Sequence, residues 1–237
     1  MALVFDLETV GEDLESLPET SRQRLIQKQL DAGLAPDTAK LEAAKQLNFS
    51  PFTSFIIAIG VYDTEKKQGA VYYQNPKIID QPSPKTSAET TDSSIKLEPM
   101  TEAKMLARFW EIASRYTRFV TFNGRGFDLP FLYIRSIVHK IRPTKDLNRG
   151  RYLYQQASDA LHYDLQDQLS FYGAGRVVSL DLACRAFNID SPKVDELDGS
   201  KVSQAYRDGR YEEIARYNGR DLIATAQLFA LWQEFLA

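Results

Sequence analysis

The chain has 237 residues, of which 43% are hydrophobic and 26% charged, a composition typical of a globular protein with a sizeable core. Its formal net charge is −3, so no overall positive field attracts a polyanion. Nucleic-acid binding would therefore require local basic patches or metal ions. The single cysteine excludes an internal disulfide framework, and two histidines make a multi-histidine zinc site a poor expectation.

The N-terminus and the apolar runs argue against export and against membrane insertion. An apolar strand that contains acids begins at Leu3, which leaves no room for the apolar region of a signal peptide. The longest apolar run, residues 55–61, is too short to span a bilayer. The one cysteine, Cys184, lies in an apolar periodic segment and is expected in the core, so we expect a cytoplasmic protein without membrane contact.

The first half of the chain predicts strands separated by polar segments. Residues 3–9 have the pattern of a buried strand, and the polar stretch 14–47 follows with helical signals, as an insertion after that strand. Residues 54–62 and 69–73 flank a charged turn and predict a β-hairpin. Residues 80–99 are rich in Pro, Ser and Thr without an apolar period, and we expect a mobile loop there, a second insertion.

The second half of the chain is mainly helical. Apolar spacing predicts a helix over residues 101–116 with Thr101 as its N-cap, then a short buried strand at 119–122 and a helix at 127–138. Further helices are expected at residues 164–172, 180–187, 201–206 and 211–235. Strands early and helices late predict an α/β fold, a sheet covered by helices, in a single domain over residues 1–237.

Acidic residues stand out at three places far apart in the sequence. Asp6 and Glu8 lie two apart and so share one face of the first strand, where buried acids are costly unless a cation compensates them. On a solvated edge strand the same pair would be unremarkable.

The other two places each have a structural explanation as well as a functional one. Asp128 follows Asn123-Gly124 where a strand turns into a helix, and an acid there is favoured by the helix dipole without any function. Tyr217 and Asp221 lie four apart and share a helix face, either in a site or facing solvent.

Together, residues 3–9 (LVFDLET), 121–128 (TFNGRGFD) and 217–221 (YNGRD) resemble the three motifs of the DEDD 3'-5' exonucleases. The match is closest to the proofreading domain of family B DNA polymerases, in the tyrosine (DEDDy) branch. Arg216 stands where the other branch has a histidine five residues before the last acid. The resemblance implies a ribonuclease H-like fold, a mixed sheet flanked by helices.

The resemblance also implies a site and a cofactor. Its catalytic and metal-binding acids would be Asp6, Glu8, Asp128 and Asp221, holding two Mg²⁺ or Mn²⁺ ions, while Tyr217 orients the attacking water. Hard cations prefer carboxylate oxygen and water, which agrees with a set of acids lacking His and Cys. Residues expected to contact substrate are Leu7, Thr9, Asn123 and Phe127, although core packing is an alternative for Phe127.

Two further features have competing interpretations. Asp164 precedes a predicted helix and is better explained as an N-cap than as a fifth ligand. Basic residues between 135 and 151 either follow a phosphate backbone or are simply solvated; they are Arg135, Lys140, Arg142, Lys145, Arg149 and Arg151.

The sequence therefore predicts a metal-dependent 3'-5' exonuclease that cleaves the 3' ends of single-stranded nucleic acid, with DNA favoured. Two alternatives remain: an exonuclease that acts on RNA, and a non-catalytic nucleic-acid or protein-binding module on the same fold. No motif identifies a protein partner.

Overall fold

The computed structural model describes residues 1–78, 94–190 and 197–237. Within them the strands form one mixed sheet in the order β4-β3-β2-β1-β5-β6. The strands are β1 (Leu3–Gly11), β2 (Ser54–Asp63), β3 (Gln68–Tyr73), β4 (Ile95–Pro99), β5 (Arg118–Thr121) and β6 (Leu161–Asp164). The predicted hairpin of β2 and β3 is confirmed as an antiparallel pair.

Strand β1 lies inside the sheet, antiparallel to β2 and parallel to β5. The strand expected at residues 119–122 thus lies beside the first strand. The pairing of β1 with β5 is confined to Leu3 opposite Phe119 and Val4 opposite Val120. Beyond Val4, this edge of β1 is therefore open to groups other than a strand.

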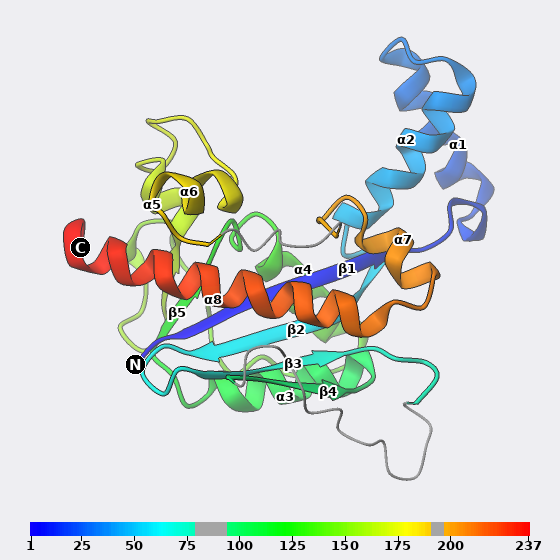
Figure 1. Ribbon diagram of the computed structural model, residues 1–237. Helices are drawn as coiled ribbons and strands as arrows, with labels where there is room; N and C mark the ends of the chain where they lie inside the picture. Colours follow the sequence, from blue (N-terminus) through cyan, green and yellow to red (C-terminus); the bar gives the residue numbers. More distant parts are fainter. Residues whose placement is uncertain (79–93, 191–196) are drawn as a thin grey trace.

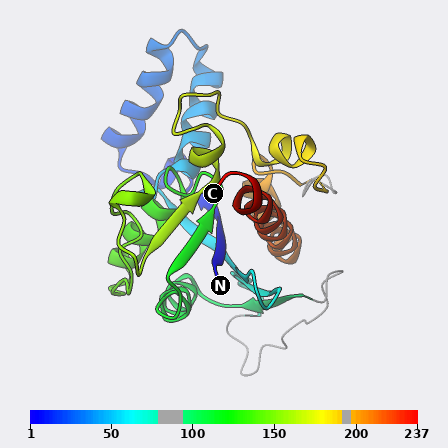
Figure 2. The same ribbon diagram turned by 90° about the vertical axis from the view of Figure 1, so that its left-hand side faces the viewer.

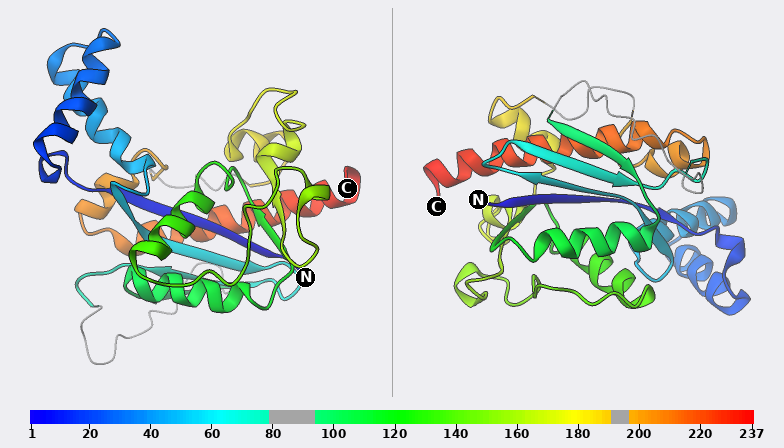
Figure 3. Two further views of the ribbon diagram at one scale, coloured as in Figure 1. Left: turned by 180° about the vertical axis from the view of Figure 1, so that it is seen from behind. Right: turned by 90° about the horizontal axis from the view of Figure 1, so that it is seen from below.

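Helices cover both faces of the sheet (Figure 3). The longer ones are α3 (Glu102–Ala113) and α4 (Asp128–Val138) on one face and α8 (Tyr211–Phe235) on the other. The shorter ones are α5 (Leu165–Leu169), α6 (Leu180–Ala186) and α7 (Val202–Arg207). A hydrophobic core lies on each face of the sheet, and side chains of β1 point alternately into the two. Leu3 and Phe5 pack in the core that contains residues of α3, whereas Val4 packs in the core that contains residues of α8.

A pair of helices projects from one end of the molecule, opposite the end that holds both termini (Figure 1). These are α1 (Glu19–Asp31) and α2 (Pro36–Gln46), which confirm the helical signals predicted within residues 14–47. Their base packs through a small apolar cluster of Leu14, Ala43 and Leu47. Across the described ranges, no helix combines the length and apolarity needed to cross a bilayer.

Three sequence expectations need correction. Residues 95–99, expected within a loop, form strand β4, parallel to β3; residues 80–93 of that segment lie outside the described residues. Strand β6 was not predicted, and it occupies the start of the helix expected at 164–172, which is shortened to α5. Strand β4 was missed because the sequence around residues 80–94 is polar. Strand β6 was missed because it has only four residues. Strands β5 and β6 lie side by side, with α5 beyond their ends (Figure 2).

Candidate active site

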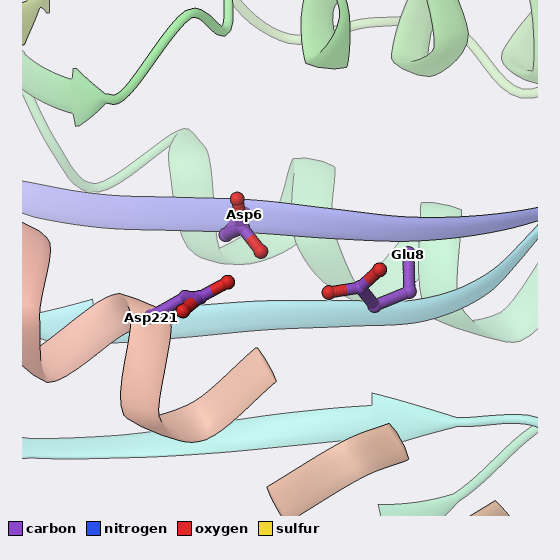
Figure 4. Close-up of side chains that lie close together, drawn as sticks. All are labelled: Asp6, Glu8 and Asp221. Carbon is purple, nitrogen blue, oxygen red and sulfur yellow. The ribbon is translucent and has the colours of Figure 1, made fainter. Parts of the chain in front are cut away.

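Three carboxylates from two elements converge at the face of β1 covered by α8. Asp6 and Glu8 alternate onto this face, and Asp221 comes from the middle of α8 (Figure 4). One oxygen of each lies within 4.8 Å of the others. The pairing with β2 shifts register between Glu8 and Thr9, so a bulge lies directly beside the acids, as is common near active sites.

The electrostatics of this cluster are unfavourable for carboxylates. Burial raises the pKa of Asp6 well above its usual value, and the neighbouring charges of Asp128, Glu8 and Asp221 raise it further. Burial likewise raises the pKa of Glu8, followed by the charges of Asp221 and Asp128. Within the described chain neither Asp6 nor Glu8 forms an ion pair. The negative charge of Asp6 and Glu8 is thus left without a paired cation among the described side chains.

Asp128 lies next to this cluster but is not one of the three acids whose oxygens lie within 4.8 Å of one another. It begins α4, is 2% exposed, and contributes the strongest of the charges that raise the pKa of Asp6. Burial raises the pKa of Asp128 to about 8, partly offset by hydrogen bonds from its own amide and from that of Leu7. The Leu7 amide belongs to the edge of β1 left open beyond Val4. Among the described residues, Oδ1 of Asp128 has no hydrogen-bond partner.

These four acids suit a hard divalent cation. The donor set is carboxylate oxygen, the surroundings are partly dehydrated, and one buried oxygen lacks a partner. A cation between Asp6, Glu8 and Asp221 would offset the repulsion that helps to raise the pKa values of Asp6 and Glu8.

Tyr217 also lies at the cluster, one helical turn before Asp221. Its side chain is largely buried, and its hydroxyl forms a hydrogen bond with Asp221. Burial raises the pKa of the phenol, and the charges of Asp221, Glu8 and Asp6 raise it further. A phenol in these surroundings stays protonated at neutral pH, so it is a hydrogen-bond donor and not a base.

Asn218 is a member of the site that the sequence analysis did not identify. It is fully buried, and its Nδ2 donates a hydrogen bond to Oδ2 of Asp6 at 2.7 Å. A second hydrogen bond from Asn218 lowers the pKa of Glu8. The amide thus positions both acids of β1 from α8.

Gly60, opposite Asp6 on β2, makes room for this amide. A Cβ at Gly60 would lie 2.0 Å from Oδ1 of Asn218 and 2.6 Å from Leu222. A side chain at position 60 would therefore have to displace the side chains of Asn218 and Leu222. The signals in the sequence were weak: Asn218 lies between two motif residues, and Gly60 stands in an otherwise apolar strand.

The four residues expected to contact substrate lie in different surroundings. The Leu7 side chain packs in the core on the opposite face from Asp6, which argues against substrate contact by this side chain. Thr9 is buried, and its hydroxyl donates to the carbonyl of Asn48 at 3.0 Å. Phe127 packs against the core with its ring 4.9 Å from Phe131, the alternative foreseen for it. Asn123 is exposed, with a positive φ of 63°.

Asp164 has the structural role expected of it. It caps α5 by accepting a hydrogen bond from the amide of Gln166, and it accepts two more from the amides of Asn123 (2.8 Å) and Arg125 (2.9 Å). These bonds fix the turn that precedes Asp128 to the end of β6.

Comparisons with known proteins agree with the fold and show the family. Residues 84–236, well over half of the chain, match a family described as "Predicted 3'-5' exonuclease related to the exonuclease domain of PolB". The chain belongs to this exonuclease family. Its match spans Asp128, Tyr217 and Asp221, whereas Asp6 and Glu8 lie before it.

Relatives of this exonuclease-family chain include DNA polymerase 1 of Saccharolobus solfataricus, 29% identical over 156 residues, and that of Sulfolobus acidocaldarius, 29% identical over 136 residues. These matches cover 59% and 54% of this chain but only 17% and 15% of the polymerases. The family B DNA polymerase of Pyrobaculum calidifontis has a similar fold, with a TM-score of 0.58 and 15% identity. That likeness covers 99% of this chain and 24% of the polymerase.

Proposed function

We propose that the protein is a metal-dependent 3'-5' exonuclease that hydrolyses phosphodiester bonds at the 3' ends of single-stranded nucleic acid. The observation that carries this proposal is the convergence of Asp6, Glu8 and Asp221 within 4.8 Å, with Asp128 beside them. Acids that repel one another at a largely buried site are poorly explained by stability alone. Mg²⁺ and Mn²⁺ are the ions that such oxygen donors favour.

The proposed mechanism assigns a task to each side chain. Asp6, Glu8, Asp128 and Asp221 would hold two divalent ions, which supply charge neutralisation on the phosphate and activation of water. Asn218 fixes the carboxylate of Asp6 through its 2.7 Å hydrogen bond. Tyr217, kept protonated by its surroundings, would orient the attacking water through its hydroxyl.

The favoured substrate is DNA, because the relatives with known names are DNA polymerases. An RNA substrate remains the alternative, since discrimination depends on how a pocket treats the 2'-hydroxyl. A non-catalytic binding module is disfavoured because all four acids and the tyrosine are present. We further propose that residues 1–237 form a single domain and that the protein acts in the cytoplasm.

End-labelled single strands of DNA and RNA, incubated with Mg²⁺, Mn²⁺ or EDTA, test the proposal. We expect stepwise shortening from the 3' end with either ion, no cleavage in EDTA, and protection by a 3'-terminal phosphorothioate. Cleavage of RNA alone would change the substrate but keep the chemistry. Absence of metal-dependent cleavage on both polymers would contradict the enzyme and favour the binding module.

A further inference from the structure

Four aromatic side chains lie beside α5, and three of them are exposed. We call Tyr152, Tyr154, Phe171 and Tyr172 the aromatic surface. Tyr154 is 82% exposed and Phe171 65%. The rings of Tyr152 and Tyr154 are nearly parallel, 13° apart with centroids at 5.7 Å, and Tyr172 lies 4.7 Å from Tyr152. Large aromatic rings gathered at a surface indicate a binding site more often than chance.

The backbone holds part of this surface in a strained conformation. Phe171 and Tyr172 both have positive φ angles, 51° and 57°, a region that costs side-chain-bearing residues about 1–2 kcal/mol each. The amide of Tyr172 donates to the carbonyl of Asp167 at 2.7 Å, and its hydroxyl accepts from Gln168 at 2.8 Å. The turn after α5 is therefore fixed with Phe171 facing solvent.

Arginines accompany the rings. Arg149 and Arg176 are exposed and form no ion pair within the described ranges, while Arg151 binds Asp167 with its Nη2 at 2.6 Å from Oδ1. Two other members of the basic run are accounted for differently. Arg135 binds Glu102, and Lys145 binds the carbonyl of Asp159. Exposed rings flanked by uncompensated arginines match a single-stranded nucleic acid, whose bases stack and whose phosphates are anionic.

The turn that leads to Asp128 and residues beside the aromatic surface line one cavity. A cavity of about 390 Å³ is lined by Asn123 and Gly126 of that turn and by Arg151, Asp167 and Gly173 beside the aromatic surface. A strand whose 3' end reached Asp128 would have this cavity and the rings within its course.

We propose that the aromatic surface binds the nucleotides preceding the 3' end of a single strand, by stacking on Tyr154 and Phe171 and by phosphate contacts with Arg149 and Arg176. This inference rests on the proposed exonuclease function of the acidic cluster. It explains how a chain of net charge −3 can hold a polyanion through a local patch.

Binding of a fluorescein-labelled decathymidylate and a decauridylate, measured by anisotropy in EDTA, tests the proposal. Tyr154→Ala and Phe171→Ala should each weaken binding about 5- to 100-fold, the range for loss of one stacking side chain. Arg149→Gln and Arg176→Gln should each lower the slope of log Kd against log salt by about 0.7. Phe52→Ala, at a phenylalanine 75% exposed in the turn before β2, is the matched control and should leave Kd unchanged.

A short substrate separates this inference from the proposed function. The p-nitrophenyl ester of thymidine 5'-monophosphate reaches only the acidic cluster, so the four variants should cleave it as the wild type does. On the decamer the same variants should show a raised KM. Two results would contradict binding by the aromatic surface and leave the proposed exonuclease unaffected. One is unchanged decamer affinity in Tyr154→Ala and Phe171→Ala; the other is an equal loss of decamer affinity in the control Phe52→Ala. Ring-dependent binding by a wild type that cleaves nothing would keep the surface and overturn the enzyme.

Discussion

The carboxylate of Glu102 on α3 and the carboxylates around Asp6 on β1 have neighbours of opposite kind: donors and a cation surround Glu102, whereas other acids surround Asp6. Glu102 accepts hydrogen bonds from two nitrogens of Arg135 and from the amide of Ile56, all at 2.8 Å, and His139 lies at the same distance. Burial acts to raise the pKa of Glu102, yet these bonds hold it below its usual value. Around Asp6, burial and three other acids all raise the pKa.

The comparison teaches that burial alone does not identify a functional acid. Glu102 has its charge balanced by the protein, so it stabilises the packing of α3, α4 and β2. Asp6 and Glu8 lie beside further acids and form no ion pair within the described chain, which lowers stability unless protons or a cation bind. Variants of the two groups should therefore have opposite effects on folding and activity.

The largest effect is expected on cleavage. Asp6→Asn or Asp221→Asn should reduce metal-dependent hydrolysis by more than about 10³-fold, beyond the loss of one positioned hydrogen bond, because a charged oxygen ligand is removed. Single-turnover cleavage at saturating Mg²⁺, with circular dichroism to verify folding, measures this. Near wild-type turnover in either variant would refute its assignment to the site.

Glu102→Ala should instead destabilise the fold, by about 3–5 kcal/mol, because it leaves Arg135 buried without a partner. Urea unfolding in EDTA measures the change. Glu111→Ala on the same helix, which removes two exposed ion pairs, is the control and should have little effect. Equal stability of Glu102→Ala and wild type would show that this buried group is not structural.

Tyr217→Phe distinguishes orientation of water from support of the metal. We expect a rate about 10²–10³-fold lower with nearly unchanged Mn²⁺ affinity, because only a hydrogen-bonding hydroxyl is lost. Asp221→Asn should weaken Mn²⁺ binding itself, as calorimetric titration would reveal. If both variants lost the same metal affinity, Tyr217 would support the metal site; unchanged cleavage would make it structural.

Stability in EDTA should fall as the pH rises from about 5 to 8. An acid whose pKa is higher in the folded state stabilises folding below its unfolded pKa, and this contribution is lost as the pH rises through the folded value. For Asp128 that value is about 8, and Asp6 and Glu8 shift in the same direction. The thermal unfolding midpoint of Asp6→Asn should depend less on pH than that of the wild type, and at pH 8 it should be higher than that of the wild type. A midpoint rising from pH 5 to 8 in the wild type, but not in Asp6→Asn, would contradict the unbalanced charge.

The smallest effect is expected at the positioning amide. Asn218→Ala should slow cleavage about 10- to 100-fold, the range for groups that orient metal ligands, and should lower Mn²⁺ affinity. Gly60→Ala should reproduce this defect by displacing the amide of Asn218. A normal rate in both variants would show that Asp6 needs no fixed orientation.

Much of the fold followed from local patterns in the sequence. Thr101 caps α3 as predicted, and apolar spacing identified α8, since both signals are confined to a few neighbouring residues. Alternation placed Asp6 and Glu8 on one face, and the same rule places Leu7 on the other, where the structure has it. The expectation that Leu7 contacts substrate did not follow that rule.

Other features depend on contacts between distant segments, which local patterns do not encode. Asn218 meets Asp6 across 212 residues of sequence, and the need for glycine at position 60 depends on the register of β1 and β2. Strand β6 is too short for a periodic signal and exists because it pairs with β5. The aromatic surface likewise joins a segment before β6 to the turn after α5.

The packing of β1 against α8 has a consequence for the order of folding. Asp6 and Asn218 meet across a separation of 212 residues, so their contact closes one of the longest loops in the chain and is expected late. Before α8 docks, Asp6 and Glu8 lie on a strand without their third acid or their amide. A cation bound by Asp6, Glu8 and Asp221 could bind only after α8 has docked. It would therefore slow unfolding far more than it speeds folding.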